Sequence, residues 1–269
     1  MKYAIITGAS KGLGEAITTR LIHEQIAVVS VSRTENEEIK RLAIEKGIEY
    51  KYFSCNLSLE KEVQEVFMEI AHYIFQKDPK EILLFNNAGV IEPIQTVGNL
   101  DQTPVIRNIQ VNLTAPILIT NLFLSKAQLT NTKITVINVT SGAAVRSIEG
   151  WSVYCSSKAG LNMFTQTAAI EQAERKTNNK IIAFNPGVMD TKMQEAIRSS
   201  TKEAFKDLEQ FKEFKEKNML LQADVVANAL VELILGGNVE SGKVYNIKEL
   251  LKYKENSPIG EPLRAKTEA

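Results

Sequence analysis

The sequence is poor in the residues that mark disulfide-bonded, metal-binding and nucleic-acid-binding proteins. Its 269 residues include only two cysteines, Cys55 and Cys155, without C-x-x-C spacing, so we expect reduced thiols and neither a disulfide framework nor a zinc site. The two histidines, His23 and His72, have no acidic or cysteine neighbours at metal-ligand spacing, and no metal site is predicted. The 32 basic and 32 acidic side chains cancel, which disfavours nucleic acid and anionic membranes as partners.

Long apolar runs are absent as well. The first residues, M-K-Y-A-I-I-T-G-A-S, hold too short an apolar stretch for a signal peptide, and no segment approaches the length of a membrane span. We therefore expect a cytoplasmic protein whose partners are small molecules. With 44% hydrophobic residues, the chain is long enough to form one large α/β domain.

Short β-branched runs alternate with longer helical patterns. Strands are predicted at 3–7, 26–32, 50–54, 82–85, 134–139, 181–184 and 244–247. Helices are predicted between them, at about 12–24, 35–46, 58–76, 101–128, 151–176 and 222–235. The strand runs are apolar throughout rather than alternating, as expected for strands buried on both faces. The pattern predicts a doubly wound Rossmann domain with a seven-stranded parallel sheet and helices on each side.

One domain is expected, because no Pro/Gly/Ser linker and no internal repeat divides the chain. Residues 1–252 are predicted as the Rossmann domain. Within it, residues 189–220 are rich in Lys, Glu and Phe and contain no strand pattern, which predicts a helical flap before the last crossover. Residues 253–269 are predicted as a polar C-terminal tail.

A glycine-rich turn follows the first predicted strand. The segment T-G-A-S-K-G-L-G has glycines at 8, 12 and 14. Glycine permits a tight turn and a close backbone approach, and the N terminus of the next helix offers free N–H groups to a pyrophosphate. We therefore predict a dinucleotide site, although the order is G-x-x-x-G-x-G rather than the commoner G-x-G-x-x-G.

The end of the second strand favours a phosphorylated ribose. Ser32 and Arg33 stand where an acidic residue would pair with a free 2′-hydroxyl. An arginine suits a 2′-phosphate instead, and Lys11 in the glycine turn can reach the same group. Two cations beside one pocket predict NADPH rather than NADH as the cofactor.

A tyrosine and a lysine four residues apart are the main catalytic candidates. Tyr154 precedes Lys158 by four residues, and Ser141 lies thirteen residues before Tyr154 at the end of a strand. On a helix this spacing places both side chains on one face, so we expect the ammonium to lower the phenol pKa toward neutral pH. Tyr73 and Lys77 repeat the spacing without a strand-end serine, and an exposed helix face is expected for that copy.

Small and amide residues follow other predicted strands. F-N-N-A-G ends the fourth, and N-P-G-V-M-D-T follows the sixth, so both should meet a cofactor at the carboxyl edge of the sheet. Asn112 falls in the middle of a predicted helix, where asparagine is a poor helix former. It is either a functional amide or a satisfied amide of the core.

Taken in order, these motifs resemble the short-chain dehydrogenase/reductase family over about residues 1–250. The resemblance implies a catalytic tetrad of Asn112, Ser141, Tyr154 and Lys158, with Asn112 holding a water that relays protons to Lys158. The family often has an aspartate near adenine where this chain has Asn56, whose amide can make a similar hydrogen bond. The predicted cofactor-binding residues are Gly8, Ser10, Lys11, Gly12, Leu13, Gly14, Ser32, Arg33, Asn56, Asn87, Ala88, Gly89, Tyr154, Lys158, Pro186, Gly187, Val188 and Thr191.

The substrate pocket is expected among the loops and the flap. Its predicted residues are Ser141, Ala143, Val145, Trp151, Tyr154, Val188, Met189, Met193 and Gln222. The set is mostly apolar with one aromatic plane in Trp151, which favours a bulky, uncharged, aromatic ketone or diketone, although several members could equally pack the core. The flap resembles that of the sepiapterin reductase branch and its bacterial relatives that reduce benzil to (S)-benzoin. Gln222 stands where sepiapterin reductases have an acidic anchor for the pterin, and this favours benzil reduction over sepiapterin reduction.

Other function classes remain open. A non-catalytic NADP sensor would keep the glycine turn but would not need the tetrad. An alcohol-oxidising dehydrogenase is disfavoured by Arg33 and Lys11, because the cellular NADPH pool is kept reduced. The family resemblance, with apolar surface on helices 101–128 and 151–176, predicts a homodimer or a dimer of dimers.

Overall fold

A seven-stranded parallel sheet forms the centre of the molecule. The computed structural model describes residues 1–256. The strands are β1 (Lys2–Thr7), β2 (Ala27–Ser32), β3 (Tyr50–Ser54), β4 (Glu81–Asn86), β5 (Lys133–Val139), β6 (Lys180–Asn185) and β7 (Val244–Asn246). They lie in the order β3-β2-β1-β4-β5-β6-β7, and every neighbouring pair is parallel. The predicted parallel, doubly wound sheet is confirmed.

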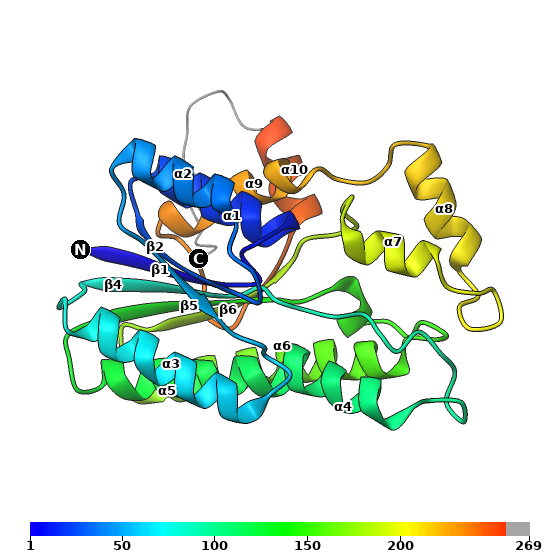
Figure 1. The fold of residues 1–269 in the computed structure, drawn as a ribbon, viewed down its shortest axis with the longest axis horizontal. Coiled ribbons are helices and arrows are strands. Elements are labelled where there is room, and N and C mark those ends of the chain that lie inside the picture. The colour runs from blue at the N-terminus through cyan, green and yellow to red at the C-terminus, as the bar shows by residue number, and fades with distance from the viewer. Residues whose placement is uncertain (257–269) are drawn as a thin grey trace, which may run out of the picture.

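Helices cover both faces of the sheet (Figure 1). One face carries α1 (Gly12–His23), α2 (Glu37–Lys46), α9 (Ala223–Leu235) and α10 (Ile247–Asn256), and the other carries α3 (Glu60–Phe75), α5 (Ala115–Ala127) and α6 (Ser152–Glu174). Successive strand residues alternate between two apolar clusters: Ala4 and Ile6 pack on the α1 side, whereas Tyr3 and Ile5 pack on the α3 side. Burial on both faces explains why the inner strands are mainly apolar, whereas the edge strand β3 exposes Lys51 and Ser54.

The helix predicted over 101–128 is interrupted by a π-helical turn. Its parts are α4 (Gln102–Ile109), the π turn Gln110–Thr114, and α5. Pro116 at the start of α5 has no N–H, and a proline ring clashes with the carbonyl four residues earlier, which belongs to Asn112. The chain widens there, and the N–H of Ala115 bonds to the carbonyl of Gln110, five residues back. Such turns often mark functional sites, and this one holds Asn112.

The flap predicted at 189–220 contains two helices, α7 (Lys192–Arg198) and α8 (Leu208–Glu216). It projects beyond the carboxyl edge of the sheet, at the right of Figure 1. Its apolar side chains form a third cluster, in which Phe205 and Phe211 pack with Tyr154 of α6 and with Trp151, the residue before α6. The flap thus packs against the helix that carries the predicted catalytic tyrosine.

The helix α10 was not predicted. The last strand was expected to reach residue 247, but β7 ends at Asn246, and α10 continues to Asn256. The side chain of Asn246 accepts a hydrogen bond from Lys248 N, as a helix-capping asparagine does, and Ile247 is fully buried. Residues 257–269 of the predicted tail lie outside the described residues. In 1–256, no helix is both long and apolar enough to cross a membrane.

Candidate active site

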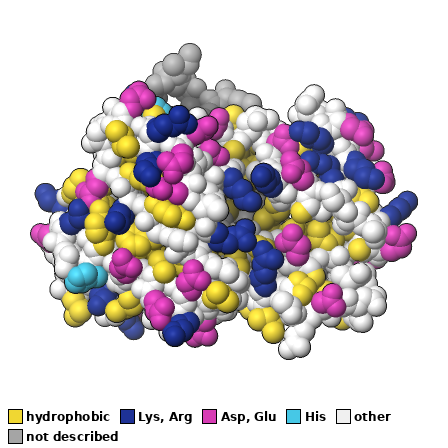
Figure 2. Space-filling view, viewed as in Figure 1, with side chains coloured by type: hydrophobic (Ala, Val, Ile, Leu, Met, Phe, Trp, Pro, Cys, Tyr) yellow, Lys and Arg dark blue, Asp and Glu magenta, His cyan; other side chains and the backbone are white. Residues whose placement is uncertain are grey.

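The predicted functional residues gather at the carboxyl edge of the sheet. The strand order reverses direction between β1 and β4, and this switch point is where parallel α/β sheets bind ligands. The glycine turn follows β1, the N-N-A-G segment follows β4, and Ser141 follows β5. Figure 2 shows Lys and Arg side chains gathered in the middle of the visible face, over this edge and beside the flap.

The glycine turn fits tightly against the end of β4. Gly8 has φ 67°, a left-handed conformation that favours glycine, and a Cβ on Gly14 would lie 2.2 Å from the carbonyl oxygen of Gly8. Asn87 holds the turn, since its Nδ2 donates to Thr7 O at 2.9 Å. The backbone N–H groups of Asn87 and Ala88 donate to the Thr7 hydroxyl at 3.0 and 3.1 Å. Only glycine at position 14 leaves room for this close approach.

The start of α1 is prepared for an anion. No side chain caps this helix, so its first N–H groups are open to a phosphate, and the buried Leu13 anchors its first turn in the core. Lys11 and Arg33 are exposed, and within residues 1–256 neither forms a salt bridge. Ser32 is buried, and its hydroxyl donates to Thr34 O at 2.7 Å.

Asn36 links these two loops and was missed by the sequence analysis. Its Nδ2 donates to Ser10 O at 3.0 Å and to Glu15 Oε1 at 2.9 Å, while its Oδ1 accepts from Ile39 N at the start of α2. It therefore ties the glycine turn to the segment that bears Arg33. The only sequence signal was an asparagine just before a predicted helix, which suggested no more than a cap.

The segment after β6 completes the predicted cofactor cradle. Thr191 lies beside Gly12, since a Cβ on Gly12 would be 3.5 Å from Thr191 Cγ2. Gly187 N donates to Asn185 Oδ1 at 3.1 Å, and Pro186 is buried. Val188 O accepts from Leu221 N at 3.0 Å, which joins this segment to the residue before the α9 cap. Asn56, by contrast, turns its Oδ1 to Ser58 N and Oγ at 3.2 and 2.9 Å.

Asn112 reaches the N-N-A-G segment from the π turn. Its Oδ1 accepts from Val90 N at 2.9 Å, and its Nδ2 donates to Val90 O at 2.8 Å. A Cβ on Gly89 would lie 3.3 Å from Asn112 Oδ1 and 3.6 Å from Lys158 Nζ, so these three residues are neighbours. The Asn112 amide is thus satisfied by the backbone, as in the core-amide alternative, while it also borders Lys158, the predicted catalytic lysine.

Asn108 and Ser157 were missed by the sequence analysis. Both are fully buried, and Ser157 Oγ donates to Asn108 Oδ1 at 3.0 Å. Asn108 Nδ2 donates to Glu92 O at 2.7 Å, and Asn112 Nδ2 donates to Asn108 Oδ1 at 2.9 Å. These amides fasten the segment after Gly89 to α4 and α6. Two asparagines four residues apart in N-I-Q-V-N were the available signal.

Tyr154 and Ser141 lie together in a buried environment. Burial raises the pKa of Tyr154 to about 12, while its hydrogen bond with the Ser141 hydroxyl acts in the opposite direction. The expected lowering of the Tyr154 pKa by Lys158 is therefore wrong for this structure, because burial dominates and the Lys158 Nζ lies 5.9 Å from the ring centroid. The phenol is protonated at neutral pH, as a proton donor must be. Ser141 Oγ accepts from Ala143 N at 3.2 Å, which leaves its own hydrogen free to donate.

Lys158 is a buried cation with unused donors. It is 3% exposed, and burial lowers its pKa to about 8. Its Nζ donates to Val139 O at 2.8 Å. An ammonium has three hydrogens, so two more are available to a ligand beside Gly89.

The predicted substrate residues lie in three different surroundings. Ala143 and Trp151 are buried, and Met193 and Val188 pack against the flap cluster that includes Tyr154. Met189 packs on the α9 side and pairs with Leu221. Val145 is 81% exposed, and Gln222 is exposed as the cap of α9 with no side-chain capping bond.

The second tyrosine and lysine pair lies elsewhere. Tyr73 and Lys77 both bind Glu49, which precedes β3 at the amino edge of the sheet, and the Lys77 Nζ lies 4.7 Å from the Tyr73 ring centroid. The Tyr3 hydroxyl also donates to Glu49, at 2.7 Å. The expected exposed helix face is thus a half-buried ionic cluster, and the pair is remote from Ser141.

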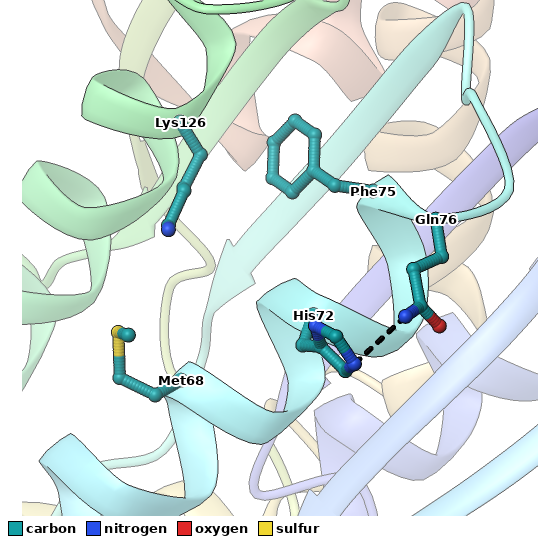
Figure 3. Close-up of a pocket in the computed structure, with 5 residues that line it drawn as sticks. All are labelled: Met68, His72, Phe75, Gln76 and Lys126. Atoms are coloured by element: carbon teal, nitrogen blue, oxygen red, sulfur yellow. Dashed lines mark hydrogen bonds between the residues drawn. The ribbon is translucent and has the colours of Figure 1, made fainter.

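A hollow of about 310 Å³ also lies away from the catalytic residues (Figure 3). Its lining residues are Lys126 at the end of α5 and, from the second half of α3 and the residue after it, Met68, His72, Phe75 and Gln76. His72 and Gln76 are in contact at 2.7 Å. These helix ends lead into β4 and β5, so the hollow lies toward the amino edge of the sheet.

Comparison with known proteins agrees with this geometry. A family model described as short chain dehydrogenase matches residues 2–202. Benzil reductase ((S)-benzoin forming) of Bacillus cereus is 39% identical over 93% of this chain and 100% of its own length. The protein of the same name from Bacillus subtilis (strain 168) is 40% identical over the same shares. Sepiapterin reductase of Bos taurus is 27% identical over 88% of this chain and 91% of its own.

Solved structures show the same fold. The KRED1-Pglu enzyme has a TM-score of 0.77 and 28% identity, covering 91% of this chain and 100% of its own. An alcohol dehydrogenase from the archaeon Thermococcus sibiricus, complexed with 5-hydroxy-NADP, has a TM-score of 0.70 and 25% identity, covering 91% and 94%. The chain belongs to the short-chain dehydrogenase family and is an oxidoreductase that acts on carbonyl or alcohol groups.

Proposed function

We propose that the protein is an NADPH-dependent carbonyl reductase for bulky aromatic ketones and α-diketones, of the type that converts benzil to (S)-benzoin. The observation that carries the proposal is the group formed by the buried Tyr154 and Lys158 and the half-buried Ser141 at the carboxyl edge of the sheet. A non-catalytic NADP sensor would gain nothing from a buried phenol and a buried ammonium, both of which are costly to maintain.

The cradle suits a phosphorylated dinucleotide. The tight glycine turn and the uncapped N terminus of α1 suit a pyrophosphate, and Lys11 and Arg33, which form no salt bridge within the described residues, are cations for a 2′-phosphate. Lys158 would hold the nicotinamide ribose with its remaining donors, and the segment 186–191 would hold the nicotinamide amide. When bound, NADPH supplies the hydride for the carbonyl carbon.

The residues of the chain supply the proton and stabilise the charge. Negative charge grows on the carbonyl oxygen, where Ser141 donates a hydrogen bond and Tyr154 donates its proton. A pKa of about 12 keeps the Tyr154 phenol protonated until negative charge develops on the carbonyl oxygen of the substrate. Asn112 positions the backbone at Val90 and Gly89, next to Lys158.

The choice of benzil rests on the two Bacillus relatives and on Gln222. Both relatives are named for benzil reduction and match 93% of the chain. Gln222 carries no charge and so offers no ionic anchor to a pterin. Sepiapterin is the second candidate, because a sepiapterin reductase matches 88% of the chain at 27% identity.

Steady-state kinetics test the proposal. Purified protein should reduce benzil with NADPH faster than with NADH, and chiral chromatography should identify (S)-benzoin as the product. Sepiapterin turnover far exceeding benzil turnover would reverse the substrate assignment, and a clear preference for NADH would overturn the cofactor assignment. An inactive protein that binds NADPH tightly would support the sensor.

The assembly is also open to measurement. Met163 and Ile170 on α6 are 62% and 64% exposed, and an apolar helix face of this kind suits a contact with a second copy. We therefore propose a homodimer or a dimer of dimers, to be measured by light scattering on the purified chain. A monomer at micromolar concentration would contradict it.

A further inference from the structure

Trp151 sits between the flap and the catalytic helix. It is 5% exposed and stacks on Phe205 of the flap, with ring centroids 4.9 Å apart and planes 4° apart. Tyr154 meets the indole edge-on at 5.7 Å, and Phe211 does so at 5.4 Å. Phe205 covers one face of the Trp151 indole, so a substrate ring cannot stack on that face. The sequence had suggested such stacking on Trp151.

The indole N–H of Trp151 has no acceptor. Nε1 is buried and makes no hydrogen bond to any residue in 1–256. A buried donor without a partner is unfavourable, because it has lost its hydrogen bond to water, and buried tryptophans usually find an acceptor. A phenylalanine would fill the same aromatic cluster without this cost. Packing alone therefore does not account for a tryptophan at this position.

We propose that Trp151 Nε1 donates a hydrogen bond to the second, non-reacting oxygen of the substrate, an inference that rests on the proposed function. Ser141 and Tyr154 receive the reacting carbonyl oxygen, and the indole lies directly against the Tyr154 ring. An acceptor on the carbon next to the reacting carbonyl comes into the same neighbourhood. The indole thereby selects 1,2-dicarbonyl compounds over ketones of equal size that lack the second oxygen.

The flap controls access to this donor. Phe205 and Phe211, which contact the indole, both belong to the flap. The apolar side chains of the flap form a cluster that is separate from the two apolar clusters on the faces of the sheet. On α7, Gln194 Oε1 and Arg198 Nη1 are also buried with no partner in the described part of the chain. A polar ligand that reaches these unsatisfied atoms must displace the apolar side chains that cover them. The flap is therefore expected to shift when the substrate binds.

Benzil and deoxybenzoin separate the hydrogen bond from the packing. Both carry two phenyl rings, but deoxybenzoin has a CH₂ group in place of one carbonyl. Trp151→Phe keeps an aromatic ring opposite Phe205 and removes the N–H. With NADPH, kcat/KM of this variant for benzil should fall about fivefold to tenfold, the effect of one hydrogen bond, while kcat/KM for deoxybenzoin stays within about twofold. Phe205→Leu, which keeps the N–H, is the matched packing control and should affect both substrates alike.

The outcomes distinguish this inference from the proposed function. If Trp151→Phe lowers kcat/KM equally for both substrates, the residue only packs and the inference is overturned. If the unaltered protein reduces neither benzil nor deoxybenzoin, the proposed function fails whatever the variant does. Trp151 is the single tryptophan of the chain, so its fluorescence reports the flap directly. Saturation with benzoin in the presence of NADP should shift the emission maximum, and an unchanged maximum would contradict the expected shift of the flap.

Discussion

Lys158 makes the stability of the protein depend on pH in a direction that can be tested. Burial lowers its pKa from 10.5 to about 8, and its described partner is the Val139 carbonyl. In the unfolded chain the pKa returns to its usual value. Between pH 8 and 10.5 the unfolded state therefore binds more protons than the folded state, and the free energy of unfolding rises with pH across this window.

The size of the effect follows from the shift. The difference between 10.5 and about 8 is about 2.5 pKa units, and at about 1.4 kcal/mol per unit this amounts to about 3 kcal/mol. Below pH 8 the folded protein bears nearly all of this cost, and above pH 10.5 it bears almost none. Lys158→Met removes the titration but keeps a long side chain. The free energy of unfolding of the wild type, relative to that of the variant, should therefore increase by about 3 kcal/mol between pH 7 and pH 10.5.

Urea unfolding followed by circular dichroism at several pH values measures this difference. Lys61→Met is the control, because the Lys61 side chain is 86% exposed and its replacement should leave a difference that barely changes with pH. Parallel pH profiles for the wild type and Lys158→Met would refute the reasoning. The same variant should have lost benzil reduction, since the ammonium proposed to hold the nicotinamide ribose is gone.

Three further substitutions test the site. Tyr154→Phe should lower kcat below about a hundredth of the wild-type value with the NADPH Kd within about twofold, because only the proton donor is removed; a faster variant would exclude Tyr154 as that donor. Arg33→Ser should raise the Kd of NADPH about tenfold in fluorescence titrations but not that of NADH, whereas equal weakening would argue against a 2′-phosphate contact. Gly14→Ala places a Cβ 2.2 Å from Gly8 O, so it should weaken NADPH binding by about tenfold or more and lower Tm. Gly142→Ala is the control and should retain NADPH binding, because a Cβ there would lie 3.7 Å from its nearest contact.

The sheet could be predicted because its signal is local. The inner strands are short, mainly apolar runs buried on both faces, so these runs themselves revealed a parallel sheet, whereas the edge strand β3 exposes Lys51 and Ser54. Helix ends were harder, since they depend on capping and on single residues. Asn246 caps α10 where a strand was expected to continue, and Pro116 opens the π turn at Asn112 within a helix that was expected to be regular.

Site residues were predictable where a motif requires a particular side chain. Gly14 must lack a Cβ to pass Gly8, and Tyr154 and Lys158 share a helix face by their spacing. Motifs could not predict the roles of Asn36 and Asn108 or the exposure of the Val145 side chain. Their contacts join segments far apart in the sequence, and no local pattern records such contacts.

The sequence by itself indicated the fold class, which the structure confirms, and it predicted a cofactor cradle and proton-transfer residues, because each depends on spacing along one element or at one strand end. Only the tertiary structure decided the electrostatics of the site. Burial sums the contributions of several distant segments, and it raised the pKa of Tyr154 and lowered that of Lys158 where spacing alone suggested that the phenol pKa would fall. The same folding placed Phe205 over Trp151 and left the indole N–H without an acceptor among the described residues.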